Sequence, residues 1–289
     1  MKKYRYLVLV LFSVILLNCS KDSSDDVTPP DNQNIDKSAN LLGTGASASD
    51  ILGNANFTDL IIEIAYVDGF RPTVEAMNAF RTFLLERTFK QDIQLVYNEL
   101  PSPNEDTLTL QEIADIETEH RTIFNDGTTM GIYIYFADAP SDGDDDEENL
   151  VTLGAVYRNT SMVIHEATIL SLASKSITIS NADVESATLN HEFGHLFGLV
   201  NLGTTPVNDH EDPDAANHCN VLGCLMRAEL QFGGSSGKSN ISSYKNMLSP
   251  GCMLSGHSVL QMLENKTSKG AAVDLDAECI LDLQANGGR

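Results

Sequence analysis

The chain has 289 residues, of which 42% are hydrophobic, so it can form one large domain or two small ones with a substantial core. Its 41 acidic residues outnumber the 18 lysines and arginines, and the formal net charge is −23 at pH 7. This balance excludes nucleic acid as a partner, because the basic surface that neutralises phosphates is missing. We interpret the charge as a solvated acidic exterior.

Residues 1–19 have the pattern of an export signal. Two lysines and an arginine give a positive start, and the apolar run 7–17 leads to Cys19. The run is short for a transmembrane helix and typical of a secretory signal. The sequence around Cys19 resembles a bacterial lipobox, which implies that Cys19 becomes the lipidated first residue of the mature protein. The alternative is an ordinary signal peptide with a chance cysteine.

Residues 20–55 are predicted to be a flexible tether, because Ser, Asp, Asn, Pro and Gly bury little apolar area. The acidic stretch after Cys19 resembles the surface-export signal of Bacteroidota lipoproteins. The resemblance implies an outer-membrane lipoprotein, held at the membrane by its lipid anchor and facing the periplasm or the cell surface. Residues 56–289 are then the folded domain.

The first half of this domain alternates between strand and helix patterns. Strands are predicted at 59–67, 92–97 and 131–137, and helices at 75–89 and 110–124, from β-branched runs and from helical apolar spacing. This order favours an α/β layer with crossover connections.

The second half begins with an acidic loop, 142–148, which we interpret as solvated because it lacks the spacing of an EF-hand calcium loop. Further strands are predicted at 151–157 and 162–169, and helices at 185–199, 259–263 and 273–284.

The segment from 191 to 195 reads HEFGH. His191 and His195 are four residues apart, so on a helix they share one face and both imidazoles can bind one metal ion. Glu192 lies beside the first of them and can take a proton from a water that zinc acidifies. This HExxH pattern is typical of zinc peptidases. The alternative is a helix with two surface histidines, which the flanking apolar residues and the export signal disfavour.

The sequence after this motif resembles the metzincin family of zinc peptidases, whose signature is HExxHxxGxxH followed by a methionine turn. Gly198 matches the glycine, at which a helix can end. The chain departs from the signature at Asn201, because a neutral amide is a poor zinc ligand and stands where the third histidine is expected. The resemblance therefore implies a replacement ligand further along the chain.

His218 is the replacement that the resemblance favours. In matrixin-like members the third histidine precedes the turn methionine by eight residues, and Met226 has that position. His218, Cys219, Cys224 and Met226 also match the archaemetzincin form of the motif. The stretch 202–217 is then an inserted loop, which costs little closure entropy. His210, inside this loop, is the rival third ligand, and it could instead form a second metal site with Asp212.

Four cysteines follow the tether, and an even number in an exported protein favours two disulfides. They are Cys219, Cys224, Cys252 and Cys279. Of the three possible pairings we favour Cys219–Cys224 with Cys252–Cys279. The alternative, a second zinc held by four thiolates, is disfavoured by the lack of a CxxC pair.

The family resemblance implies an α/β fold, with a twisted mixed sheet of about five strands, an active-site helix and a small C-terminal subdomain. It implies one catalytic zinc ion, Glu192 as general base, and peptide bonds of exported or surface proteins as substrate. The stretch 162–169 is our candidate for the strand that binds the peptide. The rival interpretations are a non-catalytic binding protein on the same scaffold and a separate metal-binding module at 202–230.

Overall fold

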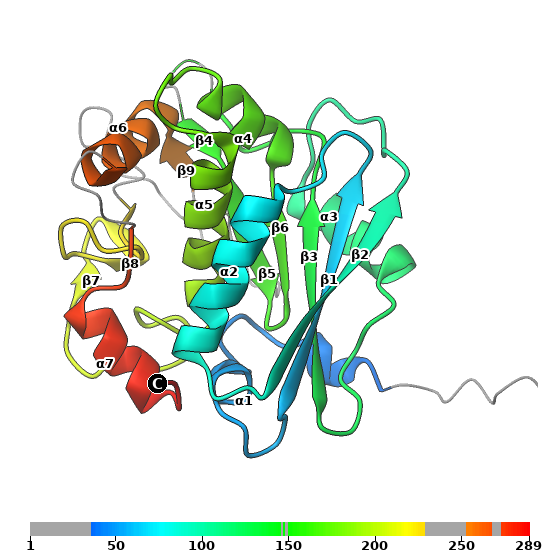
Figure 1. Cartoon of the computed structure of the whole chain (residues 1–289), viewed down its shortest axis with the longest axis vertical. Coiled ribbons are helices and arrows are strands. Elements are labelled where there is room, and N and C mark those ends of the chain that lie inside the picture. The colour runs from blue at the N-terminus through cyan, green and yellow to red at the C-terminus, as the bar shows by residue number, and fades with distance from the viewer. Residues whose placement is uncertain (1–35, 146, 148–149, 229–252, 268–272) are drawn as a thin grey trace, which may run out of the picture. The chain divides into compact units, whose positions relative to one another are not determined.

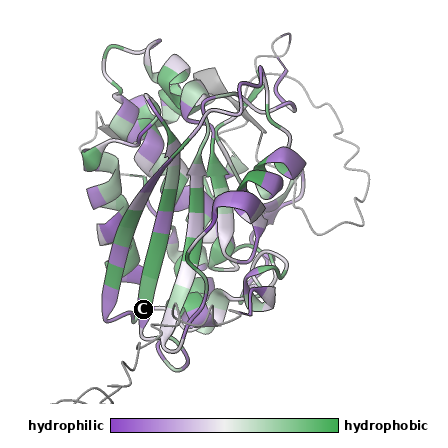
Figure 2. Ribbon diagram, turned by 90° about the vertical axis from the view of Figure 1, so that its right-hand side faces the viewer, coloured by the Kyte–Doolittle hydropathy of each residue, from purple (hydrophilic) through white to green (hydrophobic). Residues whose placement is uncertain are grey.

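The computed structural model describes residues 36–145, 147, 150–228, 253–267 and 273–289. Five strands form one mixed sheet, with helices packed on both of its faces (Figure 1). The predicted α/β class with a five-stranded mixed sheet is therefore confirmed. Hydrophobic residues follow the central strands, which lie between the helices (Figure 2).

The sheet has the order β2-β1-β3-β6-β5. Its strands are β1 (Asp59–Val67), β2 (Asp92–Leu100), β3 (Thr129–Phe136), β5 (Gly154–Arg158) and β6 (Ser161–Ile164). The first four in the sheet order run parallel, and β5 is antiparallel to β6. The central strands are long β-branched and aromatic runs that are buried on both faces, as parallel strands require.

The peptide-binding strand predicted at 162–169 is wrong. Only its first residues are a strand, and β6 lies inside the sheet between β3 and β5. From Glu166 the chain forms helix α4 (Glu166–Ala173). A continuous apolar run fits a buried strand and a buried helix equally well, which is why the boundary was missed. The outermost described strand on this side is β5.

Three longer helices begin at hydrogen-bonded caps. They are α2 (Val74–Arg87), α3 (Leu110–His120) and α5 (Asn181–Leu196). Thr73 caps α2 through its hydroxyl, while α3 and α5 begin with reciprocal capping boxes that satisfy their first backbone N–H groups. Helices α2 and α5 pack together on one face of the sheet, with Phe80 and Phe193 edge to face at 5.2 Å between ring centroids. Helix α3 covers the other face (Figure 1).

The ordered chain begins earlier than the predicted tether allowed. Residues 36–55 contain a 3₁₀ turn, η1 (Ser38–Asn40), and a short helix, α1 (Ala48–Leu52). Ile51 and Leu52 are fully buried in the main core, so this part of the tether prediction is wrong. Cys19 and residues 20–35 lie outside the described residues. Among the helices described, none has the length and apolar character needed to cross a membrane.

The remaining elements that the structure describes are two short strand pairs and two helices. Strands β4 (Leu150–Thr152) and β9 (Met253–Ser255) form one antiparallel pair, and β7 (Glu211–Asp212) and β8 (Ala215–Cys219) form a second. Helices α6 (Gly256–Thr267) and α7 (Ala277–Ala285) complete the C-terminal part. The last of these overlaps the predicted helix at 273–284.

Candidate metal centre

The last two turns of α5 carry the HExxH segment into the interior. His191, Glu192 and His195 are each at most 2% exposed. The helical spacing sets the two imidazole rings side by side, with 4.9 Å between their centroids. A pair of buried imidazoles on consecutive turns is a poor fit to the alternative of two surface histidines.

The third ring of the group belongs to His218. The helix ends at Leu196, and the chain reverses through Gly198, Val200 and Asn201, all with positive φ. Strand β8 then returns His218 to the helix, at 5.4 Å from His191 and 5.2 Å from His195 between ring centroids.

We call His191, His195 and His218 the histidine cluster. Their candidate ligand atoms all lie within 4.8 Å of one another. Three imidazole nitrogens at this spacing can converge on one ion and leave a further coordination position open.

Backbone carbonyls set the orientation of two of these rings. His191 Nδ1 lies 2.7 Å from Leu225 O, and His218 Nδ1 lies 2.9 Å from Ala216 O. A carbonyl can only accept, so each Nδ1 carries the proton and each Nε2 carries the lone pair that a metal needs. His191 Nε2 is buried without a hydrogen-bond partner, which is the state expected of a ligand atom.

Burial keeps the histidine cluster neutral. Desolvation, with a smaller effect from His218, lowers the pKa of His191 to about 3. Desolvation also lowers the pKa of His195 well below its usual value and lowers that of His218. Neutral imidazole is the form that binds metals, so the cluster is ready to bind at neutral pH.

Glu192 lies between α5 and the edge strand β5. A Cβ added at Gly154 would come within 2.7 Å of Glu192 Cγ, so the strand approaches this side chain closely. Burial raises the pKa of Glu192 to about 8, although a hydrogen bond from the Val156 N–H opposes the shift. The other carboxylate oxygen, Oε2, is buried without a hydrogen-bond partner. A carboxylate in this state is suited to exchanging a proton with a reactant.

Met226 is fully buried beneath the helix. A Cβ added at Gly194 would overlap Met226 Sδ, so the methionine packs directly on the glycine in the middle of HEFGH. Sequence reasoning gave Gly194 no role. The available signal was a glycine inside a helix, where it costs about 1 kcal/mol and usually has a packing reason.

His210, the rival third ligand, is not part of the histidine cluster. Its Nε2 lies 2.9 Å from Asp282 Oδ2 on α7, and its Nδ1 lies 3.4 Å from Cys219 Sγ. Asn201 turns away as well, and its amide donates to Glu211 Oε2 at 3.0 Å.

The predicted disulfide Cys219–Cys224 is absent. Cys219, Cys224 and Cys279 are all free and buried, and the Sγ atoms of Cys224 and Cys279 lie 3.5 Å apart. The preferred partner of Cys279 was Cys252, which lies outside the described residues. Cys279 instead reaches this group because the backbone of Leu225 pairs with Asp274, just before α7.

Two of these thiols, those of Cys219 and Cys279, form part of a second group of possible ligands. His210, Cys219, Asp276 and Cys279 offer atoms that lie within 4.8 Å of one another, and we call them the thiol cluster. Hydrogen bonds with Cys224 and Cys279 lower the pKa of Cys219, which favours its thiolate. Thiolates and imidazole are ligands that zinc prefers, and the carboxylate of Asp282 on His210 is the outer partner that a metal-binding histidine usually has.

No model of a known protein family matches the chain, and no curated protein does so. Among solved structures, the chain is similar to the crystal structure of archaemetzincin from Methanopyrus kandleri. The two share 14% sequence identity over 79% of this chain and 96% of that one, with a TM-score of 0.46. A likeness of this strength does not assign a family, so the metal centre is judged on its own geometry.

Proposed function

We propose that this protein is a zinc-dependent endopeptidase that hydrolyses peptide bonds of exported or surface proteins. The proposal is carried by one observation, the histidine cluster of three buried imidazoles with Glu192 beside it. Zinc with three protein nitrogens and an open position is the arrangement of hydrolytic sites, whereas structural sites are closed by four protein ligands.

The residues present fit the ion. His191, His195 and His218 would hold it as neutral imidazoles, and the orphaned Nε2 of His191 supports this assignment. Zinc bound there would supply a Lewis acid that polarises the scissile carbonyl and acidifies the attacking water.

Glu192 moves the proton. Its Oε2 accepts the proton of the attacking water and passes it to the nitrogen of the leaving amine. The N–H of Val156 holds the carboxylate in place during both transfers. Glu192 Oε2 is buried without a hydrogen-bond partner, so it can accept that proton without first breaking another bond.

Strand β5 aligns the substrate in this proposal. It is the outermost described strand of the sheet, and its residues Gly154 and Val156 contact Glu192. An extended peptide that pairs with the outer edge of β5 is brought alongside the carboxylate. Main-chain hydrogen bonds of this kind suit a protein substrate and give little selectivity for side chains.

Replacement of Glu192 by Gln is the decisive experiment. Gln keeps the shape of the side chain but cannot take the proton, so turnover of a mixed peptide library is expected to fall at least about 10²- to 10⁴-fold. Zinc content, measured by atomic emission, is expected to stay unchanged. Full turnover by the Glu192→Gln variant would disprove the assigned base, and a wild type that binds zinc but cleaves nothing would favour the non-catalytic binding protein.

The thiol cluster supports a second, structural zinc ion. Its ligands come from the inserted loop, β8 and α7, so an ion there would join segments that are otherwise far apart in the chain. The closed set of four candidate ligands suits a structural role. Two zinc ions per chain are expected, and a Cys279→Ser variant that still holds two would overturn this assignment.

The proposal also places the enzyme at the outer membrane through lipid attached to Cys19. The support is the lipobox pattern of the first residues. Labelled fatty acid is expected to be incorporated into the wild type and not into a Cys19→Ala variant. Equal labelling of the two would refute the anchor and leave the peptidase proposal intact.

A further inference from the structure

Residues 38–53, which the proposed chemistry does not use, cross the bottom of the domain beside the end of α5 (Figure 1). We call this segment the strap. Two of its contacts bear on the candidate site, one with the turn between β5 and β6 and one with the chain that leaves α5 toward His218. The turn follows β5, which approaches Glu192 closely, and the outgoing chain leads to His218.

The first contact is a set of hydrogen bonds to Asn159, which is fully buried in the β5–β6 turn. Asn159 and Leu42 exchange two bonds, each 3.0 Å long. The amide of Asn159 also donates to Ala39 O at 2.8 Å and to Ser47 Oγ at 2.7 Å. One residue, three positions beyond the Val156 that binds Glu192, thus holds the strap at three points between Ala39 and Ser47.

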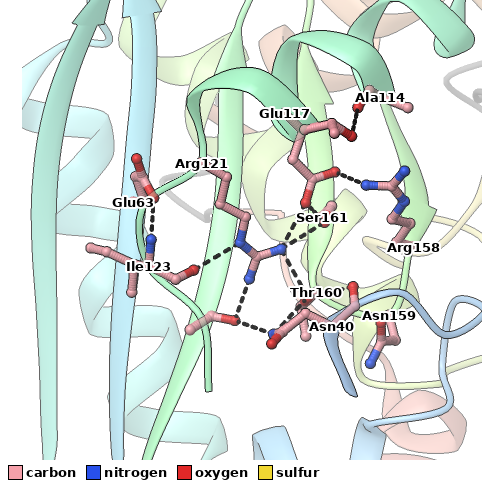
Figure 3. A network of polar contacts seen from close by, with 12 residues as sticks. Asn40, Glu63, Ala114, Glu117, Arg121, Ile123, Arg158, Asn159, Thr160 and Ser161 are labelled. Atoms are coloured by element: carbon pink, nitrogen blue, oxygen red, sulfur yellow. Dashed lines mark hydrogen bonds and ion pairs between the residues drawn. The ribbon is translucent and has the colours of Figure 1, made fainter. Parts of the chain in front are cut away.

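Asn40 reinforces this contact on the other side of the turn. Its amide donates to Thr160 Oγ1 at 3.1 Å and to Gly131 O at 3.1 Å. Figure 3 shows that the same network includes Arg121, whose guanidinium also bonds Thr160 and Gly131. The strap is therefore joined to the sheet by buried polar bonds, which are costly to break singly.

The second contact is backbone against backbone. Gly45 and Gly203 both have positive φ and face each other. A Cβ at Gly45 would overlap the carbonyl oxygen of Leu202, and one at Gly203 would lie 2.8 Å from Gly45 Cα. A Cβ at Gly198 would lie 3.1 Å from Ala48 Cβ. Only glycines allow this approach.

The segment that the strap meets is strained. Val200 and Asn201 adopt φ of 53° and 62°, in the left-handed region that a β-branched residue such as Val200 rarely enters. Such a conformation persists only where its surroundings impose it. The strap on one side and Asn286, which donates to Phe197 O at 3.0 Å, on the other supply that constraint.

We infer that the strap is a positioning element of the active site, which sets the path of residues 198–204 and so brings His218 to His191 and His195. This inference rests on the proposed function, because it assigns the strap to the same metal centre. The strap lies within residues 20–55, the stretch that composition predicts to be a tether, so an ordered part of that stretch helps to complete the site.

Two glycines in the strap give a matched test. Gly45→Ala places a methyl group against Leu202 and strains a positive φ, whereas Gly43 has open space around its Cβ. Both substitutions are made in the whole chain. We expect Gly45→Ala to weaken cobalt binding at the histidine cluster at least about tenfold and to alter its visible absorption, which reports the ligand set. Gly43→Ala is expected to match the wild type. Thiolate charge-transfer absorption identifies cobalt at the thiol cluster.

A second measurement does not depend on the metal. In the metal-free protein, amide hydrogen exchange of residues 199–218 is expected to be faster in Gly45→Ala than in Gly43→Ala. Equal cobalt affinity and equal exchange in the two variants would overturn the inference, even if Gly45→Ala melted at a lower temperature. Faster exchange in Gly45→Ala, together with a wild type that binds no cobalt, would support the strap as positioning His218 and overturn the metal centre instead.

Discussion

The histidine cluster and the thiol cluster are built in opposite ways. The first takes two of its three residues from one helix, so most of its geometry is set by a single hydrogen-bonded turn. The second takes its residues from the inserted loop, β8 and α7, and exists only when these segments meet. A preformed and open group suits chemistry, whereas a group assembled from distant segments suits cross-linking them. The predictions below test this contrast.

The largest effect is expected at the third histidine. His218→Ala removes one of three ligands and is expected to lower the zinc affinity of the histidine cluster, and peptide turnover with it, by about 10³-fold or more. With zinc in excess, His210→Ala is the matched control for turnover, because His210 bonds Cys219 and Asp282 instead. Zinc titration and peptide turnover measure both. If His210→Ala abolished turnover while His218→Ala retained it, the thiol cluster would be the catalytic metal site and the histidine cluster would not.

Loss of a thiol is expected to act on stability. Cys279→Ser should release the metal of the thiol cluster and lower the free energy of unfolding by about 2 to 4 kcal/mol, since metal binding contributes directly to folding. Urea unfolding with and without a chelator measures this. The metal-free wild type and the metal-free variant are expected to differ little. If Cys279→Ser lost turnover although its histidine cluster held a full complement of zinc, the thiol cluster would not have a purely structural role.

Gly194→Ala tests the support beneath the histidines. The added methyl group overlaps Met226, and overpacking of this kind costs about 1 to 3 kcal/mol. The free energy of unfolding is therefore expected to fall, and turnover should fall with it as the helix shifts. Met226→Ala should therefore lower the free energy of unfolding less in the Gly194→Ala background than in the wild type, because it removes the atoms that the added methyl group meets. If the single variant behaved like the wild type, the close packing of Met226 on the helix would be wrong.

The smallest effect is expected at Glu166 on α4, which lies beside Glu185 of α5. Burial, and then the charge of Glu185, raise the pKa of Glu166 to about 10. The folded protein therefore holds a proton that the unfolded chain releases. The resulting stability is fully present below about pH 4.5, the ordinary value, and is lost progressively as the pH rises toward 10.

Glu166→Gln should remove this dependence and raise the free energy of unfolding at pH 9 by about 1 to 2 kcal/mol. Urea unfolding at pH 5 and pH 9 measures the slope. Glu264→Gln, at an exposed carboxylate, is the control, and it is expected to keep the wild-type pH dependence. An unchanged slope in Glu166→Gln would place the titrating group elsewhere.

Local patterns predicted local structure well. The β-branched runs of β1 and β3 and the capped helix α5 were identified because their signals lie within a few residues. The spacing between His218 and Met226 anticipated that His218 would lie beside the helix, and the three rings do lie together. Their role as zinc ligands stays a prediction.

Apart from the boundary between β6 and α4, where one apolar run fits a strand and a helix equally well, the misses were long-range. The cysteine pairing failed because Cys224 meets Cys279 through the contact between Leu225 and Asp274, which spacing cannot indicate. The strap was missed because it has no apolar periodicity, and the partners of the Asn40 side chain and of Leu42 lie between 85 and 120 residues away in the sequence. Composition alone therefore predicted a flexible tether where residues 36–55 are ordered.

His218 and Cys219 are neighbours on β8, although each belongs to a different cluster. An ion bound at either cluster would hold β8 in place and so position the ligand that β8 contributes to the other cluster. Zinc binding at the two clusters is then expected to be cooperative. The first ion already orders β8, so the second ion binds without that loss of conformational entropy. When zinc is scarce, most protein molecules would then hold either both ions or none. The zinc concentration would change the fraction of active molecules and leave the turnover rate of each active molecule unchanged.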